Sequence, residues 1–194
     1  MSFEEGTWVW CPDDEDMYLP GKVNKSFKQG EAASVTLEDG EVLELTAKQT
    51  AAGAERPVLV LDEQSLKPVE NMVSLNDLNE PAILHNLRLR FKRDKIYTAV
   101  GTILVAVNPF KLLPIYTPEI MDKYKTQGAR DLPPHVYGVA DDTYRSMIRD
   151  HANQSVIISG ESGAGKTEST KLILQYIAEV SSKRGGGSAA AAAT

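Results

Sequence analysis

The sequence predicts an α/β protein in which a mixed sheet with flanking helices follows a small antiparallel β-barrel. Two observations on secondary structure predict this fold: short apolar runs with tight-turn residues fill residues 1–55, and longer helix and strand patterns alternate over residues 56–181. The third observation is charge, because residues 1–70 carry a net charge of −9 and residues 71–194 a net charge of +3. Such an asymmetry indicates two structural units.

Composition excludes several classes of protein. The 194 residues are 42% hydrophobic and 25% charged, which is typical of globular proteins and excludes a disordered or collagen-like chain. The net charge of −6 argues against a nucleic-acid binder, and a single cysteine, Cys11, excludes an internal disulfide. The start of the chain, with Glu4 and Glu5, does not fit a signal peptide, and the aliphatic runs are too short to span a bilayer. We therefore expect a cytoplasmic protein that neither inserts into membranes nor binds nucleic acid.

The N-terminal part reads as short strands joined by tight turns. Trp8 to Trp10 is an aromatic and β-branched run, and the runs 35–37 and 42–45 flank Asp39-Gly40. An Asp-Gly pair between alternating apolar residues predicts a two-residue type I′ hairpin, in which both central residues have positive φ. The Ala- and Gly-rich stretch from residue 50 to residue 57 predicts the boundary of this first domain, over residues 1–55.

Helices and strands then alternate. Apolar residues at helical spacing predict four helices. The first covers residues 81–91 with Asn79 as N-cap, and the second starts at Pro118 with Thr117 as N-cap. The other two cover residues 136–148 and 167–181. The apolar run 99–107 predicts one strand buried on both faces, and residues 155–159 predict a second, short strand. Residues 182–194 are low in complexity and predict a flexible tail.

One motif carries chemistry. Residues 160–167 read Gly-Glu-Ser-Gly-Ala-Gly-Lys-Thr and satisfy G-x-x-x-x-G-K-[ST], the phosphate-binding loop. The glycines have no side chains to cover the backbone N–H groups, and the start of the following helix favours an anion. Lys166 supplies a positive charge for the β- and γ-phosphates, and the Thr167 hydroxyl can ligate Mg²⁺. The alternative is a glycine-rich turn at the start of a helix. The apolar run before the motif and the amphipathic helix after it favour phosphate binding.

Several motifs together carry a resemblance to one family. The loop with Glu168, GESGAGKTE, resembles that of the myosin motor head, and four further segments resemble myosin segments in the same order along the chain. These are LNEPAILHNL at residues 78–87, NPFKLLPIY at residues 108–116, PHVY through YRSM at residues 134–147, and NQS at residues 153–155. The acidic N-terminal part looks like the SH3-like barrel that precedes many myosin heads, and among subtypes the chain looks closest to classes V and XI.

The resemblance implies a fold and a site. The fold would be a P-loop NTPase-type sheet, incomplete here, over residues 56–181. The site would bind ATP and Mg²⁺. The loop would wrap the phosphates, with Thr167 on the metal, and Glu168 would support the loop. The adenine would be framed by Asn108, Pro109, Lys111 and Tyr116. From the residues alone, Asn-Pro after a buried strand also predicts a turn at the edge of a sheet, and for Tyr116 core packing is the alternative.

Other candidate features have structural interpretations. The run Val58–Glu63 imitates a magnesium-holding ATPase strand, but such a strand normally follows the phosphate loop, so we expect a structural strand. His85, His135 and His151 lack metal-ligand spacing and are expected at the surface or at helix caps. Five bases between Arg88 and Lys95 are expected to be a solvated helix end.

The resemblance implies that the chain is the N-terminal part of a motor that couples ATP hydrolysis to movement along actin filaments in the cytoskeleton. The hydrolytic switch elements, the actin-binding faces and the lever arm that binds light chains or calmodulin would lie downstream, so no catalytic residue is expected here. We expect the piece alone to be marginally stable, to bind Mg·ATP weakly or not at all, and not to hydrolyse it. Two alternatives stay open: a small P-loop phosphotransferase, and an SH3-like interaction module with an inactive P-loop appendage.

Overall fold

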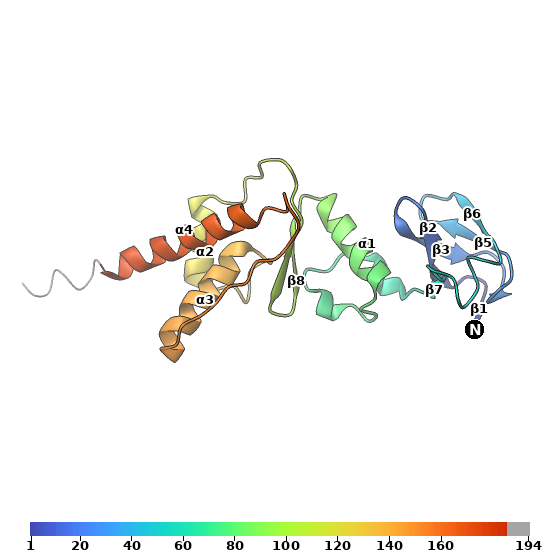
Figure 1. The fold of residues 1–194 in the computed structure, drawn as a ribbon, viewed down its shortest axis with the longest axis horizontal. Helices are drawn as coiled ribbons and strands as arrows, with labels where there is room; N and C mark the ends of the chain where they lie inside the picture. Colours follow the sequence, from blue (N-terminus) through green and yellow to red (C-terminus); the bar gives the residue numbers. More distant parts are fainter. Residues whose placement is uncertain (186–194) are drawn as a thin grey trace, which may run out of the picture. The chain divides into compact units, whose positions relative to one another are not determined.

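A computed structural model describes residues 1–185 of the chain (Figure 1). The chain divides into two compact units, Met1–Arg93 and Asp94–Thr194. The division between the two compact units, after Arg93, lies later in the chain than the boundary predicted at residue 55. The predicted domain ranges stay predictions.

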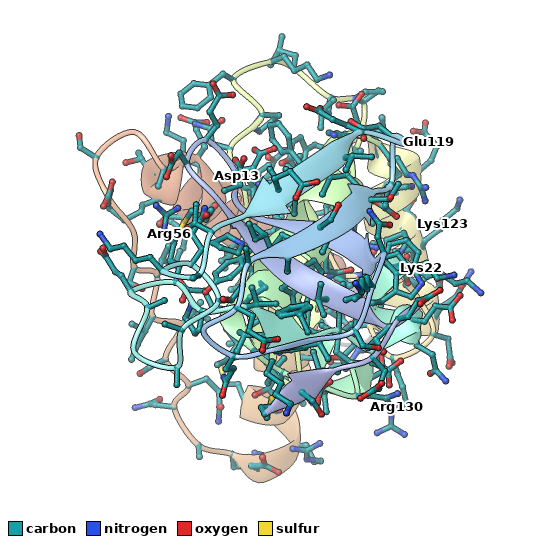
Figure 2. All side chains as sticks on the ribbon, turned by 90° about the vertical axis from the view of Figure 1, so that its right-hand side faces the viewer. Asp13, Lys22, Arg56, Glu119, Lys123 and Arg130 are labelled. Carbon is teal, nitrogen blue, oxygen red and sulfur yellow. The ribbon has the colours of Figure 1, made fainter. Side chains whose placement is uncertain are left out.

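The first unit is built on antiparallel strands. These are β1 (Ser2–Phe3), β2 (Trp8–Asp13), β3 (Met17–Val23), β4 (Phe27–Lys28), β5 (Ala33–Leu37), β6 (Val42–Leu45) and β7 (Leu59–Val60). Five of them form one sheet in the order β6-β5-β3-β2-β7, and β1 pairs separately with β4. The apolar core beneath includes Phe3, Val9, Val35 and Leu45. Arg56 ties the chain beyond β6 to the end of β2, because its guanidinium donates to the Asp13 carbonyl and pairs with the Asp14 carboxylate at 3.1 Å (Figure 2).

The predicted closed barrel is not seen. Within the described residues, β6 and β7 are the two edges of the five-stranded sheet and do not pair with each other. The short β7 pairs only with β2, through Val9 with Val60 and Trp10 with Leu59. In the described part of the chain the sheet is therefore open, with β6 at one edge and β7 at the other. The likeness to an SH3 domain stays a prediction.

The hairpin around Asp39-Gly40 forms, but its turn differs from the prediction. Gly40 has φ +90°, whereas Asp39 is not among the residues with positive φ. Gly40 N–H donates to the Leu37 carbonyl at 3.0 Å and Leu37 N–H donates to the Glu41 carbonyl at 2.8 Å. This is a three-residue loop that ends in a left-handed glycine, which needs only one residue with positive φ.

The run 58–63 has the structural role that was expected. Its strand is β7, and the Asp62 side chain caps the 3-10 helix η1 (Glu63–Leu66) by accepting from Gln64 N–H. Asn76 also donates to Asp62 at 2.7 Å, and these two hydrogen bonds lower the pKa of the carboxyl. The carboxylate is therefore occupied by local contacts.

Helix α1 (Glu80–Phe91) completes the first unit, after the 3-10 helix η2 (Met72–Ser74). Its N-cap is Asn79, as predicted, with the side chain accepting from Ala82 N–H at 3.0 Å. The buried face of this helix is partly polar, because His85, Asn86 and Arg90 are buried while Phe91 is exposed. Asn86 can be buried because its side-chain amide forms hydrogen bonds with both the N–H and the carbonyl of Val69.

The second unit begins with a hairpin where one strand was predicted. Strand β8 (Tyr97–Val100) pairs antiparallel with β9 (Ile103–Ala106), and Val100 lies opposite Ile103 across the turn. Gly101 has φ +60°, a conformation that glycine adopts readily and that lets the chain reverse. The prediction of a strand buried on both faces is therefore wrong, and Ile103 is 65% exposed.

Three helices follow: α2 (Pro118–Gln127), α3 (Val136–Asp150) and α4 (Lys166–Gly185). Thr117 caps α2 as predicted, and α3 and α4 pack side by side (Figure 1). Their contact is polar at its centre, where the Tyr176 hydroxyl donates to the buried Asp141 carboxylate at 2.9 Å. Around it, the core of this unit includes Met121, Tyr124 and Ile173.

Residues 155–159 do not form the predicted strand. They have no regular secondary structure, and Ile157 is 92% exposed. A strand needs a neighbour for its backbone groups, and no segment of the described chain pairs with this one. The described residues of the second unit therefore supply one two-stranded sheet and mixed α/β content, and the larger P-loop-type sheet stays a prediction.

At the C-terminal end, α4 continues to Gly185, so residues 182–185 of the predicted tail are helical. The rest of that predicted tail lies outside the described residues. None of the helices within residues 1–185 combines the length and the apolar character that crossing a membrane requires.

Candidate functional site: a glycine-rich loop at a helix start

The predicted phosphate-binding loop forms a compact turn directly before α4. Ala164 N–H donates to the Glu161 carbonyl at 3.2 Å and closes the turn. Gly163 and Gly165 have φ +81° and +94°, where a Cβ atom would strain the backbone. At Gly160 there is also little room for a side chain, since a Cβ atom there would lie 3.1 Å from the Ala164 side chain. Three glycines are therefore required by the shape of the loop.

The loop presents donors without acceptors. Within the described chain, the backbone N–H groups of residues 165–168 have no hydrogen-bond acceptor, as is usual for the first turn of a helix. Lys166 adds a positive charge, and its Nζ donates to the carbonyls of Gly160 and Glu161 at 2.7 and 2.8 Å. The ammonium thus lies across the loop, where a helix start already favours negative charge. The arrangement suits a polyphosphate.

The remaining loop residues are open to solvent. Glu161, Ser162, Ala164 and Thr167 are exposed, and Thr167 lies in the first turn of α4. Glu168 follows it in the same turn, and its carboxylate pairs with Lys171 at 2.7 Å. In the structure Glu168 therefore contacts its own helix, and its predicted support of the loop stays a prediction.

The structure brings the two predicted parts of the site together through Asn108. Its side-chain amide donates to the Gly163 carbonyl at 2.8 Å, and its Oδ1 accepts from Phe110 N–H at 2.9 Å. The segment of residues 108–116, which we call the Asn-Pro segment, thus begins against the glycine-rich loop. Pro109 is half-buried beside Asn108, whereas Phe110 has φ +49° and is 85% exposed.

The other two predicted adenine contacts lie in different surroundings. Lys111 forms an ion pair with Asp94 at 2.6 Å, and both side chains are about half exposed. Tyr116 is half-buried, and its hydroxyl shares a hydrogen bond of 2.8 Å with the hydroxyl of Tyr97. This is the core packing that was the alternative for Tyr116, with the hydroxyl bonded to a second tyrosine.

An aromatic cluster that was not predicted from the sequence supports the end of the Asn-Pro segment. His135 is 7% exposed and its ring lies 4.7–5.6 Å, centre to centre, from the rings of four tyrosines. These are Tyr97, Tyr116, Tyr124 and Tyr137. His135 is the N-cap of α3, which confirms the expected cap, and its ring is buried. The signal in the sequence was a histidine immediately before the apolar stripe of a helix.

Burial sets the charge of this histidine. Burial of the ring lowers the pKa of His135 to about 4, although the hydrogen bond to the Ile115 carbonyl acts in the opposite direction. His135 is therefore neutral near pH 7. His85 in the first unit is also buried, where burial and the nearby Arg88 charge lower its pKa. His85 lies within α1 and is neither a surface residue nor a helix cap, so the prediction is wrong for this histidine.

A groove of about 510 Å³ lies beside the loop. Apolar side chains line most of it, among them Leu104, Val139 and Ile173, and Lys166 is the charged residue at its wall. Such a lining suits apolar side chains better than a triphosphate, so we assign the phosphate-binding character to the N–H groups and Lys166 at the loop itself.

Comparison with known proteins identifies relatives of one kind. A sequence profile of the myosin head (motor domain) matches residues 69–191. The chain is 46% identical over 182 residues to the high molecular weight form of myosin-1 from Acanthamoeba castellanii, covering 94% of this chain and 11% of that protein. It is 46% identical over 182 residues to myosin-VIIa of Drosophila melanogaster, covering 92% and 8%. It is 41% identical over 176 residues to human unconventional myosin-Vc, covering 89% and 10%.

These matches cover most of the chain but only a small part of each relative, since the chain spans about a tenth of the length of the relatives it matches. Relatives of several classes match at similar identity, so the predicted likeness to classes V and XI stays a prediction.

Proposed function

The chain belongs to the myosin head (motor domain) family, and from this premise we propose that it holds the ATP of an actin-based motor. In the proposed function, Mg·ATP binds at the glycine-rich loop, and the complete head couples its hydrolysis to movement along actin. Light chains or calmodulin on a lever arm are further proposed partners of the complete motor.

The observation that carries the proposal is the loop's set of unpaired donors around one ammonium group. Four consecutive N–H groups point to no acceptor in the described chain, and Lys166 Nζ donates to two loop carbonyls instead of to an acidic side chain. Phosphate oxygens are better acceptors for a cation than neutral carbonyls are, so a triphosphate would draw the ammonium to itself. The loop residues present therefore fit the proposed ligand.

The predicted phosphate and base contacts each have a role in this proposal, and Glu168 supports the loop. The backbone from Gly160 to Thr167 wraps the phosphates, and the Thr167 hydroxyl ligates Mg²⁺, which neutralises charge on the phosphate oxygens when bound. Asn108 and Pro109 start the wall that faces the base, and the proposal adds Lys111 and Tyr116 farther along the Asn-Pro segment. The contact of Asn108 with Gly163 supports this arrangement, because it places the base and phosphate elements next to each other.

The test is a chimeric motor. Residues 69–185 of this chain replace the corresponding residues in the head of the Acanthamoeba relative, and the actin-activated ATPase is measured. We expect activity in the chimera, a loss of about a hundredfold or more in Lys166→Ala, and a change below about twofold in Lys171→Ala. Lys171 is the matched control, since it is an exposed lysine on the same helix whose partner is Glu168.

Two results would contradict the proposal. One is a folded chimera without ATPase activity, which would favour the phosphotransferase or interaction-module alternatives. The other is a Lys166→Ala chimera that keeps full activity, which would show that the ammonium does not act on the phosphates.

A further inference from the structure

The Asn-Pro segment is held at both ends and is largely exposed in the middle. At its start, Asn108 bonds the glycine-rich loop through the Gly163 carbonyl. In the middle, Phe110 and Leu112 project into solvent and are 85% and 101% exposed. The ion pair of Lys111 with Asp94 is about half exposed and Leu113 is only partly buried, so the position of the segment depends on its far end as well.

The far end is fixed by the first residues of α3. His135 Nε2 lies 3.0 Å from the Ile115 carbonyl, and His135 Nδ1 accepts from Tyr137 N–H at 3.0 Å. Because Nδ1 accepts, the proton of the neutral ring is on Nε2, and Nε2–H donates to Ile115. One imidazole thus caps α3 and holds the backbone of the Asn-Pro segment at the same time.

Tyrosine hydroxyls reinforce this anchor. The Tyr137 hydroxyl donates to the Tyr116 carbonyl at 3.3 Å, so the carbonyls of residues 115 and 116 are both held from α3. The hydroxyls of Tyr97 and Tyr116 share a further bond. The ring of His135 stacks on Tyr124 of α2, with 5.3 Å between ring centres. The anchor is therefore buried and connected to three elements.

We propose that His135 is a positioning residue for recognition of the nucleotide base. By holding the Ile115 carbonyl, it sets where the Asn-Pro segment lies against the glycine-rich loop, without contacting the nucleotide itself. The inference rests on the proposed function, in which the Asn-Pro segment faces the base and the loop holds the phosphates.

The test separates base from phosphate binding in the full chain. His135→Asn keeps an N-cap acceptor for α3, but its amide is too short to hold the Ile115 carbonyl as well. The affinities for Mg·ATP and for Mg·tripolyphosphate, which lacks a base, are measured by NMR titration. Hydrogen exchange of the amides of residues 108–116 is followed in parallel. His151→Asn is the matched control, because His151 is the exposed residue at the other end of α3 with φ +49°, which asparagine tolerates.

In His135→Asn we expect the affinity for Mg·ATP to fall about fivefold to tenfold, since one buried hydrogen bond is lost. The affinity for Mg·tripolyphosphate should change by less than about twofold, and exchange across residues 108–116 should become faster. Tyr137→Phe, which removes only one hydroxyl, should shift ATP affinity and exchange in the same direction by a smaller factor. His151→Asn should leave all three measurements unchanged.

The possible failures are distinguishable. Equal losses for both ligands would overturn the proposal, because they would indicate general damage to α3 packing. Unchanged exchange in His135→Asn would refute the anchor itself. Equal affinity of the wild-type chain for Mg·ATP and Mg·tripolyphosphate would refute base recognition by the segment. If the wild-type chain binds neither ligand, the same affinities are measured in the chimeric head, where absence of binding would refute the proposed function and, with it, the role in base recognition.

Discussion

At the scale of single residues, the surroundings of His135 determine its charge. Its pKa is lowered to about 4 by burial, whereas an exposed histidine titrates near 6.5. Between these two pH values the unfolded chain binds a proton that the folded chain does not. The free energy of unfolding therefore decreases as the pH falls from about 6.5 to about 4. Above about pH 6.5, the contribution of His135 to the free energy of unfolding does not change with pH.

We predict that His135→Asn reduces the acid sensitivity of the second unit. The shift corresponds to roughly 3 kcal/mol, which the wild-type chain loses between about pH 6.5 and pH 4 and the variant does not. Urea unfolding at several pH values, followed by tyrosine fluorescence, gives the difference between the two chains. That difference should favour the wild type most at neutral pH and shrink in acid. A difference that is constant with pH would contradict the neutral, buried ring.

A second residue-scale prediction concerns Gly163, which has φ +81° and open space where a Cβ would be. Gly163→Ala meets no neighbour, so its effect comes from backbone strain of about 1–2 kcal/mol. The loop can relieve this strain by changing shape, and we expect the affinity for Mg·tripolyphosphate to fall about fivefold or more. Gly53→Ala is the control, since Gly53 has the same open space without positive φ. Equal affinities in the two variants would show that the loop needs no left-handed residue at position 163.

At the scale of elements, local signals were readable from the sequence and long-range ones were not. The caps Asn79 and Thr117 were predicted because a cap acts within three residues. The apolar run 99–107 was read as one strand, since its composition does not reveal that Gly101 turns the chain. Residues 155–159 have the composition of a strand, but a strand also requires a partner, which the run itself does not encode.

The same distinction applies to the candidate site. The glycine-rich loop is one continuous motif, so its turn and the helix that follows it were predictable. The contact between Asn108 and Gly163 spans 55 residues, and the contact between His135 and Ile115 spans 20. Both depend on how elements pack, and a histidine before a helix predicts only the local cap. The anchor of the Asn-Pro segment therefore could be found only in the structure.

The contact between α3 and α4 gives an element-scale prediction, because α4 begins in the glycine-rich loop. The Tyr176 hydroxyl is buried and donates to Asp141, whose other oxygen accepts from Arg145 at 2.5 Å. Tyr176→Phe leaves Asp141 with one fewer donor, and we expect a loss of about 1–2 kcal/mol in the free energy of unfolding. A double-mutant cycle with Asp141→Asn measures the coupling between the two side chains. A coupling near zero would contradict the importance of this hydrogen bond.

At the scale of the whole molecule, the two compact units carry different spectroscopic probes. Both tryptophans, Trp8 and Trp10, lie in the first unit, and six of the seven tyrosines lie in the second. The second unit also contributes α2, α3 and α4, the larger share of the helical residues described. Tryptophan fluorescence therefore reports the unfolding of the first unit, and far-UV circular dichroism at 222 nm reports mainly the second.

These probes test where the ligand binds. The glycine-rich loop and the Asn-Pro segment both belong to the second unit, so a ligand there stabilises that unit directly. At a concentration of Mg·tripolyphosphate 100 times its dissociation constant, the stabilisation is about 2.7 kcal/mol. We expect the thermal transition seen at 222 nm to move several degrees upward, and the tryptophan transition to stay within about one degree. An equal shift of both signals would mean that the units unfold as one cooperative body, and a shift of tryptophan alone would place the ligand in the first unit.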